Sequence, residues 1–330
     1  MGKQAFITGG SGFLGGHIVR LLIEQGWTVT ALHRPGGNRE HLLNLGARPV
    51  AAQLHEASQL AEVMPEAPDA VFHVAGNTAM WRKLNAQQYR DNVLGTRAVV
   101  HAARQRGAQR LIHTSSISAY GIQQQPIDES TPSNAEHDWI NYNRTKYLGE
   151  QEVRDGLRHG LDAVILNPCG IIGAGDTHNW SQLIALIDAG QLPGVPPGAG
   201  SFCHVTEVAK AHIAAVEKGR TGANYILSGV DASFLELART ISDLLHRKAP
   251  RRAVPKAVLR VAGRVYPLLS VFSGEEPRLT PEKVALVTNR VIANSERAQR
   301  ELGFNAAVPL RTMLEECIQW MRAEGMLQAA

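Results

Sequence analysis

The stretch Thr8-Gly9-Gly10-Ser11-Gly12-Phe13-Leu14-Gly15 decides the fold of this chain. It follows Gln4-Ala5-Phe6-Ile7-Thr8, a short and mostly apolar run that predicts a buried strand. The residues after it, from His17 to Glu24, have the apolar spacing of a helix. A glycine-rich turn between a strand and a helix is the setting in which such a turn binds a pyrophosphate.

Each of three glycines in this turn has a physical task. Gly9 permits the tight turn, Gly12 lets a pyrophosphate approach without a Cβ in the way, and Gly15 lets the helix pack close to the strand. Free N–H groups at the start of the helix then face the anion. We expect Phe13 and Leu14 to contact the same ligand, so the turn predicts a dinucleotide site.

Short apolar runs alternate with helical patterns through the first half of the chain. The predicted strands that follow are Thr28 to His33, Asp69 to Val74, Arg110 to Thr114 and Leu161 to Leu166. The predicted helices are Ala86 to Arg106 and Asn141 to His159. Strands that are apolar throughout and alternate with helices indicate a parallel sheet covered on both faces. We therefore expect an α/β fold, a Rossmann doubly wound parallel sheet.

The pattern changes after residue 168. Residues 1–168 are expected to form the dinucleotide-binding domain, and 169–330 mainly a smaller, mostly helical substrate-binding domain. Residues 202–228 are expected to return to the first domain. Glycine and proline fill 190–200, which predicts a loop, and 281–330 has mostly helical patterns.

Composition narrows the class of protein. The chain has 330 residues, 44% of them hydrophobic and 19% charged, which excludes a disordered chain. Its net charge of +4 mildly favours anionic ligands, and aromatic residues at 5% argue against a nucleic-acid partner. No apolar run reaches the roughly 18 residues of a membrane span. Cys169, Cys203 and Cys317 are odd in number and far apart, which favours reduced thiols and a cytoplasmic location.

The residues after the second strand bear on the choice of dinucleotide. A carboxylate at this place would hold the ribose hydroxyls of NAD, but Leu32 to Arg39 contains no acid. Arg34 lies where a guanidinium can bind a 2′-phosphate. The sequence therefore favours NADP(H) over NAD(H), and the alternative is that Arg34 is only a solvated loop cation.

Tyr142 and Lys146 lie at positions i and i+4 on one predicted helix face. A neighbouring ammonium favours the phenolate, so the pair has the chemistry of an acid–base catalyst. Serines follow the strand that ends at Thr114, at the sheet edge where ligands bind in such folds. A serine hydroxyl there can hold a substrate carbonyl oxygen. Spacing alone does not choose among Ser115, Ser116 and Ser118.

Over nearly its whole length the chain resembles the extended short-chain dehydrogenases/reductases, the NAD-dependent epimerase/dehydratase superfamily. The matching segments are TGGSGFLG at Thr8 to Gly15, VFHVAG at Val71 to Gly76, NVLGT at Asn92 to Thr96, TSSISAYG at Thr114 to Gly121, YNRTK at Tyr142 to Lys146 and NPCGIIGAGD at Asn167 to Asp176. Dihydroflavonol-4-reductase-like proteins look most similar, and hopanoid-associated sugar epimerases nearly as similar.

The resemblance implies catalytic roles. It selects Ser116 as the catalytic serine, makes Tyr142 the general acid–base, and gives Lys146 the tasks of binding the nicotinamide ribose and tuning Tyr142. Asn92 matches the asparagine of the family's NVxGT motif, which supports the proton relay.

The resemblance also implies further cofactor contacts, with one departure. They come from Val74, Ala75, Gly76, Thr114, Pro168, Gly170 and Ile171, of which Pro168 and Ile171 would border the nicotinamide. The third strand usually ends in Gly-Asp-Leu, whose aspartate touches the adenine, but this chain has Ala52-Gln53-Leu54. Gln53 can still hydrogen-bond an adenine amine, with Leu54 beside it.

Three functions remain open. The first is an NADP(H)-dependent reductase of an aldehyde or ketone, in which Tyr142 supplies the proton and Ser116 orients the oxygen. The second is an NAD(P)-dependent nucleotide-sugar epimerase or dehydratase, for which Arg278 and Arg290 would have to bind the diphosphate. The third is a dinucleotide sensor without catalysis, which would not need the tyrosine–lysine pair.

Other polar residues carry weaker hypotheses. Trp81 can form a wall of the substrate pocket, and His178 can contact the substrate just past the nicotinamide segment, as can Ser116. His73, His113 and His204 have no ligand spacing, so we expect structural histidines and no metal site.

None of these three functions explains one basic and apolar stretch of the sequence. Residues 244–274 contain seven basic side chains and no acid, and Val258 to Phe272 is mostly apolar. The alternatives are a packed helix with solvated arginines, a lid or lipid-contacting surface, and a dimer contact. The resemblance leaves two oligomeric states open, a homodimer through the helices near 86–106 and 142–158, and a monomer as in related reductases.

Overall fold

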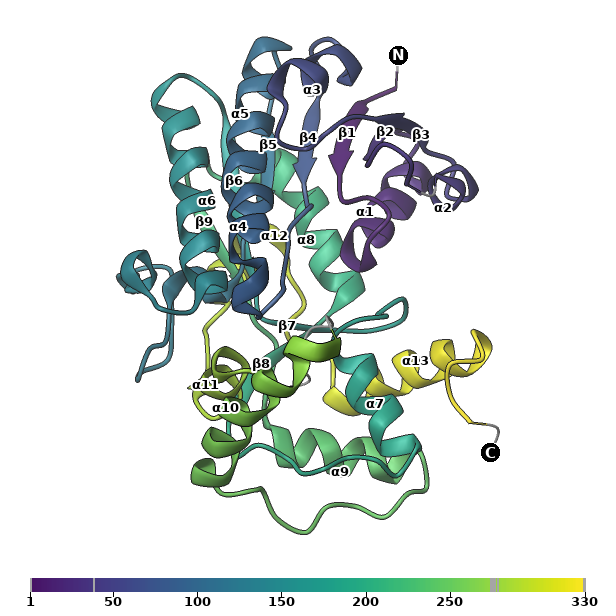
Figure 1. Ribbon diagram of the computed structural model, residues 1–330. Helices are drawn as coiled ribbons and strands as arrows, with labels where there is room; N and C mark the ends of the chain where they lie inside the picture. Colours follow the sequence, from purple (N-terminus) through teal and green to yellow (C-terminus); the bar gives the residue numbers. More distant parts are fainter. Residues whose placement is uncertain (1, 38, 274–276, 278, 329–330) are drawn as a thin grey trace.

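A seven-stranded parallel sheet forms the centre of the molecule, a computed structural model that describes residues 2–37, 39–273, 277 and 279–328, without the side chains of 266–273 (Figure 1). The order of the strands is β3-β2-β1-β4-β5-β6-β9. Their bounds are β1 Gln4–Thr8, β2 Thr28–His33, β3 Arg48–Ala51, β4 Ala70–His73, β5 Leu111–Thr114, β6 Ala163–Pro168 and β9 Asn224–Leu227. The sheet is the doubly wound Rossmann arrangement that the sequence predicted.

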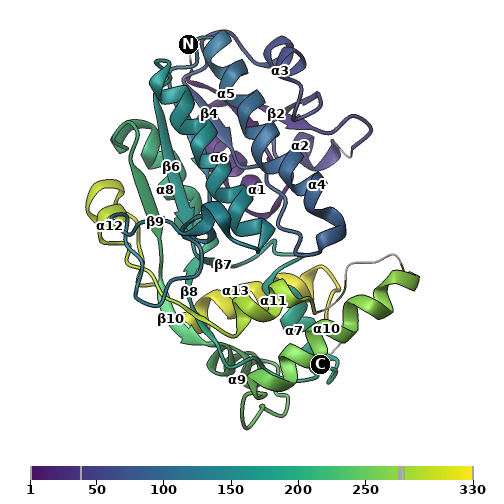
Figure 2. The same ribbon diagram turned by 60° about the vertical axis from the view of Figure 1, so that its left-hand side comes forward.

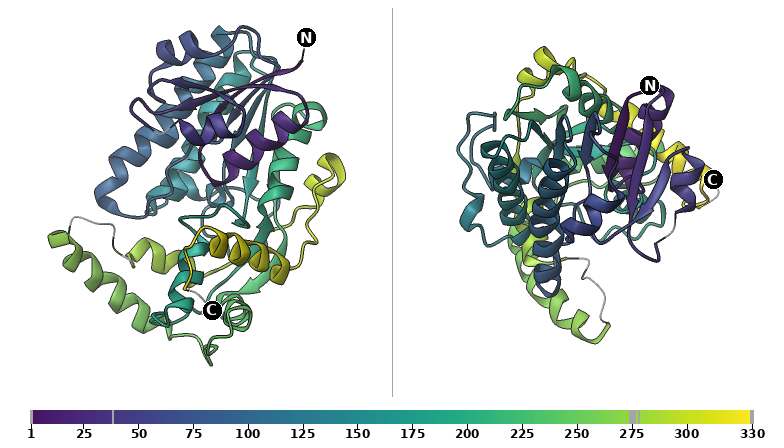
Figure 3. Two further views of the ribbon diagram at one scale, coloured as in Figure 1. Left: turned by 90° about the vertical axis from the view of Figure 1, so that its right-hand side faces the viewer. Right: turned by 90° about the horizontal axis from the view of Figure 1, so that it is seen from above.

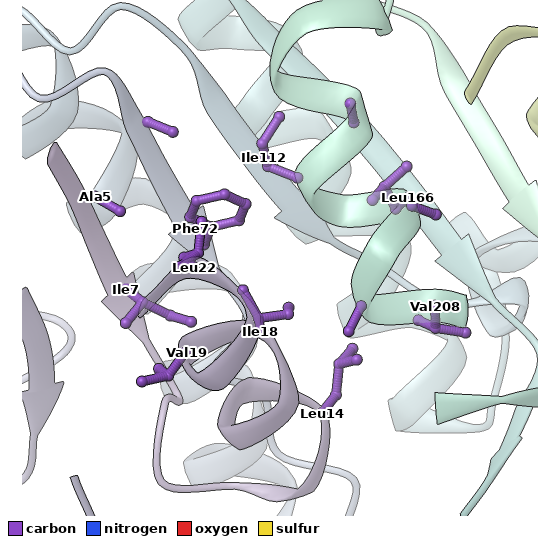
Figure 4. Packing of buried hydrophobic residues seen from close by; sticks show 14 of the residues in the cluster. Ala5, Ile7, Leu14, Ile18, Val19, Leu22, Phe72, Ile112, Leu166 and Val208 are labelled. Atoms are coloured by element: carbon purple, nitrogen blue, oxygen red, sulfur yellow. The ribbon is translucent and has the colours of Figure 1, made fainter. Parts of the chain in front are cut away.

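Helices cover both faces of this sheet (Figure 3). One face carries α1 (Phe13–Glu24), α8 (Val205–Lys218) and α12 (Glu296–Leu302), and the other carries α3 (Ala57–Val63), α5 (Gly95–Gln105) and α6 (Asn141–Arg158). The strands are apolar on both sides because both faces are buried. On the α1 and α8 side the core includes Ile7, Phe72, Ile112, Leu166 and Val208, as Figure 4 shows.

The strand order reverses beside β1, and this reversal locates the candidate site at the carboxyl ends of β1 and β4. β1 pairs with β2 on one side and with β4 on the other, with Thr8 opposite His73 at the carboxyl end. Ligands of doubly wound folds bind in the crevice outside the strand ends at such a switch point. The glycine-rich turn after β1 and the segment after β4 therefore meet at the same edge of the sheet.

A second sheet organises the C-terminal half, and the sequence had not predicted it. Its middle strand β8 (Ala199–His204) pairs antiparallel with β10 (Val230–Ser233) on one edge and parallel with β7 (Gly170–Ile172) and β11 (Arg290–Val291) on the other. It packs with α7 (Trp180–Asp188), α9 (Phe234–Leu244) and α13 (Leu310–Ala323). The loop expected over 190–200 ends earlier, because Ala199 and Gly200 already pair in β8.

Two helices lie at the outside of the C-terminal half. α10 (Lys256–Ser273) and α11 (Pro281–Val287) are packed together, and α10 extends along the periphery of the molecule (Figure 2). Among the described residues, no helix combines the length and the apolar composition needed to cross a bilayer.

The boundaries of several predicted elements change for local reasons. β1 and β2 have the predicted bounds, but α1 begins at Phe13, four residues before the predicted start, because the glycines hide its first turn. The single helix expected over 86–106 is interrupted. It consists of α4 (Asn85–Tyr89), a π-helical turn (Arg90–Leu94) and α5, and such turns are frequent at functional sites. β9 joins the central sheet and α8 packs on α1, while the domain boundary at 168 stays a prediction.

Candidate active site

The glycine-rich turn leaves no room for side chains at two of its glycines. Gly9 has a φ of 74°, and a Cβ there would lie 2.6 Å from the amide nitrogen of Ala75. A Cβ on Gly15 would lie 2.0 Å from the carbonyl oxygen of Gly9. At Gly12 that same oxygen, at 3.3 Å, is the one atom of the described residues within 4 Å of a Cβ, so the approach is open.

The start of α1 faces this opening without a side-chain cap. Uncapped N–H groups and the positive end of the helix dipole make a site for an anion. The turn therefore fits the pyrophosphate of a dinucleotide, both in space and in electrostatics.

The segment after β4 joins the turn to the second half of the site. The amide of Ala75 donates to the Thr8 hydroxyl at 3.3 Å, and the amide of Val74 donates to the Thr8 carbonyl at 3.2 Å. A Cβ on Gly76 would lie 3.7 Å from both Lys146 Nζ and Asn92 Oδ1. The structure thus brings the predicted cofactor residues of β4 next to two predicted catalytic residues.

Arg34 is exposed on the loop after β2. Beside this loop lies a hollow of about 560 Å³ lined by His33, Gly36, Gly37, Arg39, Glu40 and Leu43. Arg39 is a second cation at this place that the sequence analysis had not singled out. Its signal was its position five residues after Arg34 in an acid-free segment.

Gln53 and Leu54 follow β3 at the same edge of the sheet. The side chain of Gln53 is exposed, and its backbone amide donates to Gln59 Oε1 at 3.0 Å. Leu54 packs closely on α5, since a Cβ on Gly95 would lie 3.0 Å from its side chain. The side-chain amide of Gln53 is therefore accessible to a ligand, while Leu54 is half-buried.

Tyr142 lies in the first turn of α6, and Ser116, which follows β5, is the side chain that lowers the pKa of its phenol. Burial raises the pKa of the Tyr142 phenol, and the hydrogen bond with Ser116 partly lowers it. Of the three candidate serines, Ser115 is engaged elsewhere, because its hydroxyl donates to Glu150 Oε1 at 2.6 Å. Ser118 contributes its backbone amide, which donates to Ser116 Oγ at 3.1 Å.

Lys146 lies one helical turn after Tyr142 and is buried. Its ammonium donates to the carbonyl oxygen of Thr114 at 2.9 Å, at the end of β5. Burial lowers the pKa of Lys146 to about 8, and the charge of Glu150 acts in the opposite direction. A lysine with this pKa changes charge near neutral pH, which suits a group that tunes a phenol.

Asn92 lies in the π-helical turn and connects two elements. Its Nδ2 donates to the Asn77 carbonyl at 2.9 Å and to the Thr145 hydroxyl at 3.1 Å. Its Oδ1 accepts from the Asn77 amide at 2.7 Å. Because both ends of the amide are engaged, Asn92 holds the segment after β4 against α6, and so fixes the distance between the cofactor residues and Lys146.

Glu150 is a residue of this site that the sequence analysis missed. Its buried carboxylate accepts from Asn167 Nδ2 at 2.6 Å and from Asn224 Nδ2 at 3.1 Å, besides the Ser115 hydroxyl. The signal was its spacing, since Tyr142, Lys146 and Glu150 lie at i, i+4 and i+8 on α6.

Buried histidines lie beneath the site. His73 is enclosed between the hydroxyls of Thr8, at 2.8 Å, and Thr96, at 2.9 Å, and burial lowers its pKa to about 3. His113 lies beside it with ring centroids 5.2 Å apart, and its Nδ1 has no hydrogen-bond partner among the described residues. His204 contacts Glu316 at 2.7 Å. The described residues contain no group of three side chains that could hold a metal ion.

The predicted substrate residues lie in different surroundings. Trp81 is half-buried with the Lys83 ammonium 5.1 Å from its ring, and its neighbour Arg82 donates to Glu282 of α11 at 2.8 Å. His178 is exposed in the loop before α7. That loop is shaped by Asp176, whose buried carboxylate accepts the backbone amides at 178, 179 and 181.

Pro168, Gly170 and Ile171 connect the two sheets. Pro168 ends β6, while Gly170 and Ile171 open β7 beside β8. Cys169, Cys203 and Cys317 are free thiols, and burial raises the pKa of Cys169 and Cys317 to about 12. Their chemistry is therefore that of unreactive interior thiols.

Comparison with known proteins agrees with this geometry. The model of the NAD dependent epimerase/dehydratase family matches residues 5–227. A putative dihydroflavonol 4-reductase of Synechocystis sp. is 29% identical, over 98% of this chain and 96% of its own. The 4-hydroxy-2-methyl-3-oxo-4-farnesyl-3,4-dihydroquinoline-1-oxide ketoreductase of Stigmatella aurantiaca is 32% identical, over 92% of each chain.

A solved structure extends the likeness to the whole fold. The crystal structure of gox2253 superposes with a TM-score of 0.86 at 30% identity, and covers 99% of this chain and 100% of that one. These comparisons confirm the expected resemblance to extended short-chain dehydrogenases/reductases and an NAD(P)-dependent oxidoreductase. The chain is a member of the NAD dependent epimerase/dehydratase family.

Proposed function

We propose that this protein reduces an aldehyde or ketone with NADPH. The observation that carries the proposal is the loop after β2, where Arg34 is exposed and Leu32 to Arg39 offers no carboxylate for the ribose of NAD. Arg39 adds a second cation beside the hollow. Both guanidiniums are suited to a 2′-phosphate.

The side chains around Tyr142 have matching roles in the reaction. The hydroxyls of Ser116 and Tyr142 hydrogen-bond the carbonyl oxygen of the substrate and orient it. Tyr142 donates its proton to that oxygen as the carbonyl becomes an alcohol, and the Lys146 ammonium stabilises the phenolate that remains. The bound dinucleotide supplies the hydride to the carbonyl carbon.

The remaining cofactor residues follow the path from the glycine turn. Gly9, Gly12 and Gly15 with the backbone of Phe13 and Leu14 hold the pyrophosphate, and Gln53 with Leu54 borders the adenine. Backbone from the ends of β4, β5 and β6–β7 completes the site through Val74, Ala75, Gly76, Thr114, Pro168, Gly170 and Ile171.

The substrate belongs to the apolar carbonyl compounds. Support comes from the Stigmatella relative, which is named as the ketoreductase of a farnesyl-bearing quinoline. Trp81 forms an apolar wall and His178 a polar contact in this proposal. The protein acts in the cytoplasm, as its free cysteines favour. Its homodimer forms through α5 and α6, which pack side by side (Figure 1).

The test is equilibrium binding of NADPH and NADH to the purified protein after bound cofactor has been removed. Charge-assisted hydrogen bonds to the 2′-phosphate give an expected NADPH preference of about 10- to 150-fold. Arg34→Gln should remove most of that preference and leave NADH binding unchanged. Arg48→Gln, which removes an exposed arginine from the start of β3, should leave both affinities unchanged.

Equal binding, or tighter binding of NADH, would overturn the proposal. The alternative, a nucleotide-sugar epimerase or dehydratase that keeps NAD bound, would then take its place. The name of the family includes epimerases and dehydratases, and this favours the alternative as the second candidate. Of the two arginines considered for its diphosphate site, Arg290 is exposed on β11, and Arg278 lies outside the described residues.

A further inference from the structure

We propose that α10 binds the surface of membranes that contain anionic lipids and lies in the plane of the lipid headgroups. The proposal concerns how the protein is placed in the cell and is independent of the cofactor and of the reaction. It rests on the burial, the charge and the neighbours of the described part of this helix.

An apolar stripe on α10 faces solvent. Val258, Val261 and Val265 are 55%, 63% and 46% exposed, and are three of the seven exposed large hydrophobic side chains among the described residues. The other four, Leu43, Tyr89, Trp139 and Met326, belong to four separate parts of the chain. At 3.6 residues per turn, the three valines fall within an arc of about 60°. Such a stripe on an exposed helix needs a partner.

The amino-acid sequence stays mostly apolar after Val265, where the side chains lie outside the described part of the chain. Leu268, Leu269 and Phe272 keep the spacing that begins with Val258, Val261 and Val265.

The opposite side of α10 is already covered by α11. A Cβ on Gly263 would lie 2.7 Å from the side chain of Val284 and 3.4 Å from the carbonyl oxygen of Thr280. Gly263 lies about 170° from the centre of the valine stripe on the helix circumference. The contact with α11 therefore lies on the far side of the helix from the three exposed valines.

The charge beside the stripe selects the partner. Arg260 and Arg264 are exposed on one flank, and Arg251 and Arg252 are exposed just before the helix. The sequence from 244 to 274 has seven basic residues and no acid. A protein partner would need a matching acidic and apolar surface, whereas anionic lipid provides negative headgroups and an apolar interior together.

The position of α10 gives this surface a link to the candidate site. Glu282, on α11, has a buried carboxylate that accepts from Arg82 Nε at 2.8 Å, next to Trp81. The helix pair is thereby tied to the segment that follows β4.

The test is co-sedimentation of the full chain with vesicles of phosphatidylcholine alone and of an equal mixture of phosphatidylcholine and phosphatidylglycerol. We expect binding to the mixed vesicles that is roughly tenfold or more tighter than to the neutral ones, and that weakens with salt. V258S/V261S/V265S should weaken binding to the mixed vesicles about tenfold. R260Q/R264Q should weaken it by a similar factor and leave binding to neutral vesicles unchanged.

Matched controls remove equivalent side chains from other surfaces. Met326→Ser removes an exposed apolar side chain, and R104Q/R322Q removes two exposed arginines. Both should bind vesicles as the parent does. Circular dichroism and affinity for NADPH report whether each variant is folded, and R260Q/R264Q decides the matter if the valine variant is not.

Two results would overturn the proposal. In the first, the parent does not bind mixed vesicles, or the folded α10 variants bind them as well as the parent does. In the second, light scattering shows that V258S/V261S/V265S converts a dimer to a monomer while vesicle binding is absent, so that a second copy of the chain covers the stripe.

Discussion

The side-chain amide of Asn167, at the end of β6, donates a hydrogen bond of 2.6 Å to the buried carboxylate of Glu150 on α6. The same amide donates to the backbone carbonyl of Ser116 at 3.1 Å. Glu150 therefore holds the backbone of the proposed catalytic serine through Asn167, while Tyr142 and Lys146 lie two turns and one turn before it on the same helix. We infer that Glu150 is a positioning residue.

Glu150→Gln should move the pH dependence of the reaction. The charge of Glu150 raises the pKa of Lys146 against the effect of burial, so its removal lowers that pKa further below about 8. Reduction needs the lysine ammonium, so activity is present below this pKa and is lost above it. The alkaline limb of kcat/KM should therefore shift to lower pH.

Two variants separate this role from a merely structural one. Glu152→Gln removes the same charge from a half-buried side chain of α6 that pairs with Arg97, and should leave the pH profile in place. Glu150→Asp keeps the charge and should restore the alkaline limb. If the alkaline limb of kcat/KM stays at the same pH in Glu150→Gln, the positioning role is contradicted.

Tyr142→Phe should abolish the proton transfer and spare the cofactor site. We expect kcat to fall by about 10²- to 10⁴-fold, with the affinity for NADPH within about twofold of the parent. Steady-state kinetics and equilibrium binding measure the two effects separately. Tyr147→Phe, on the next turn of the same helix, should keep full activity. Retained turnover in Tyr142→Phe, or loss of NADPH binding, would refute the assignment.

Gly15→Ala should damage the glycine turn, and its neighbour provides the control. A Cβ at Gly15 would lie 2.0 Å from the Gly9 carbonyl oxygen, whereas at Gly16 the nearest atom, His41 Nε2, is 3.4 Å away. Overpacking of this kind costs about 1–3 kcal/mol. We expect Gly15→Ala to lower the melting temperature. We also expect it to weaken the affinity for NADPH by tenfold or more. If Gly16→Ala has the same effect, the close contact at Gly15 is not the cause.

The protein should become less stable as the pH is lowered, because it buries neutral histidines. Burial lowers the pKa of His73 to about 3 and of His212 to about 4, whereas in the unfolded chain both titrate near 6.5. Between these values the unfolded state binds more protons than the folded state. The stabilisation is complete above about pH 6.5 and is lost progressively as the pH falls toward the folded-state values.

Urea unfolding at about pH 7.5 and pH 5 measures this effect. His212→Asn should flatten the difference in unfolding free energy between the two pH values, whatever its effect on stability at pH 7.5. His159→Asn, which removes an exposed histidine from the end of α6, should leave the difference unchanged. An equal difference in His212→Asn and the parent would rule out His212 as a source.

Local sequence was enough to predict the sheet and the glycine turn. β1 and β2 have their predicted bounds because each is a short apolar run next to a turn, and the turn is encoded within eight residues. The choice of Ser116 needed the family resemblance as well, since spacing alone did not distinguish it from the two neighbouring candidate serines. The structure adds the reason that Ser115 is held by Glu150, which lies 35 residues away in sequence.

Other features could not be predicted because they are made by residues far apart in the chain. The hydrogen bonds among Glu150, Asn167 and Asn224 join α6, β6 and β9, which no single window of sequence contains, so spacing could indicate only the helix face of Glu150 and not its partners. The second sheet includes a strand of only two residues, β11, which pairs with a strand 91 positions earlier, with Arg290 opposite Ala199. The π-helical turn at Asn92 contains neither proline nor glycine, so the residues that usually mark an interruption of a helix gave no signal.

The path of the chain between the two sheets has a consequence for its synthesis. After β6 the chain leaves the central sheet, builds β7, α7 and β8, and returns through α8 to add β9 beside β6. A growing chain that has emerged only to residue 168 therefore carries six strands with the β6 edge unpaired, and lacks the α8 cover of the α1 face. Exposed edges of this kind favour association with other chains. Fragments that stop before residue 227 should aggregate, and chaperones should engage the nascent chain until β9 has been made.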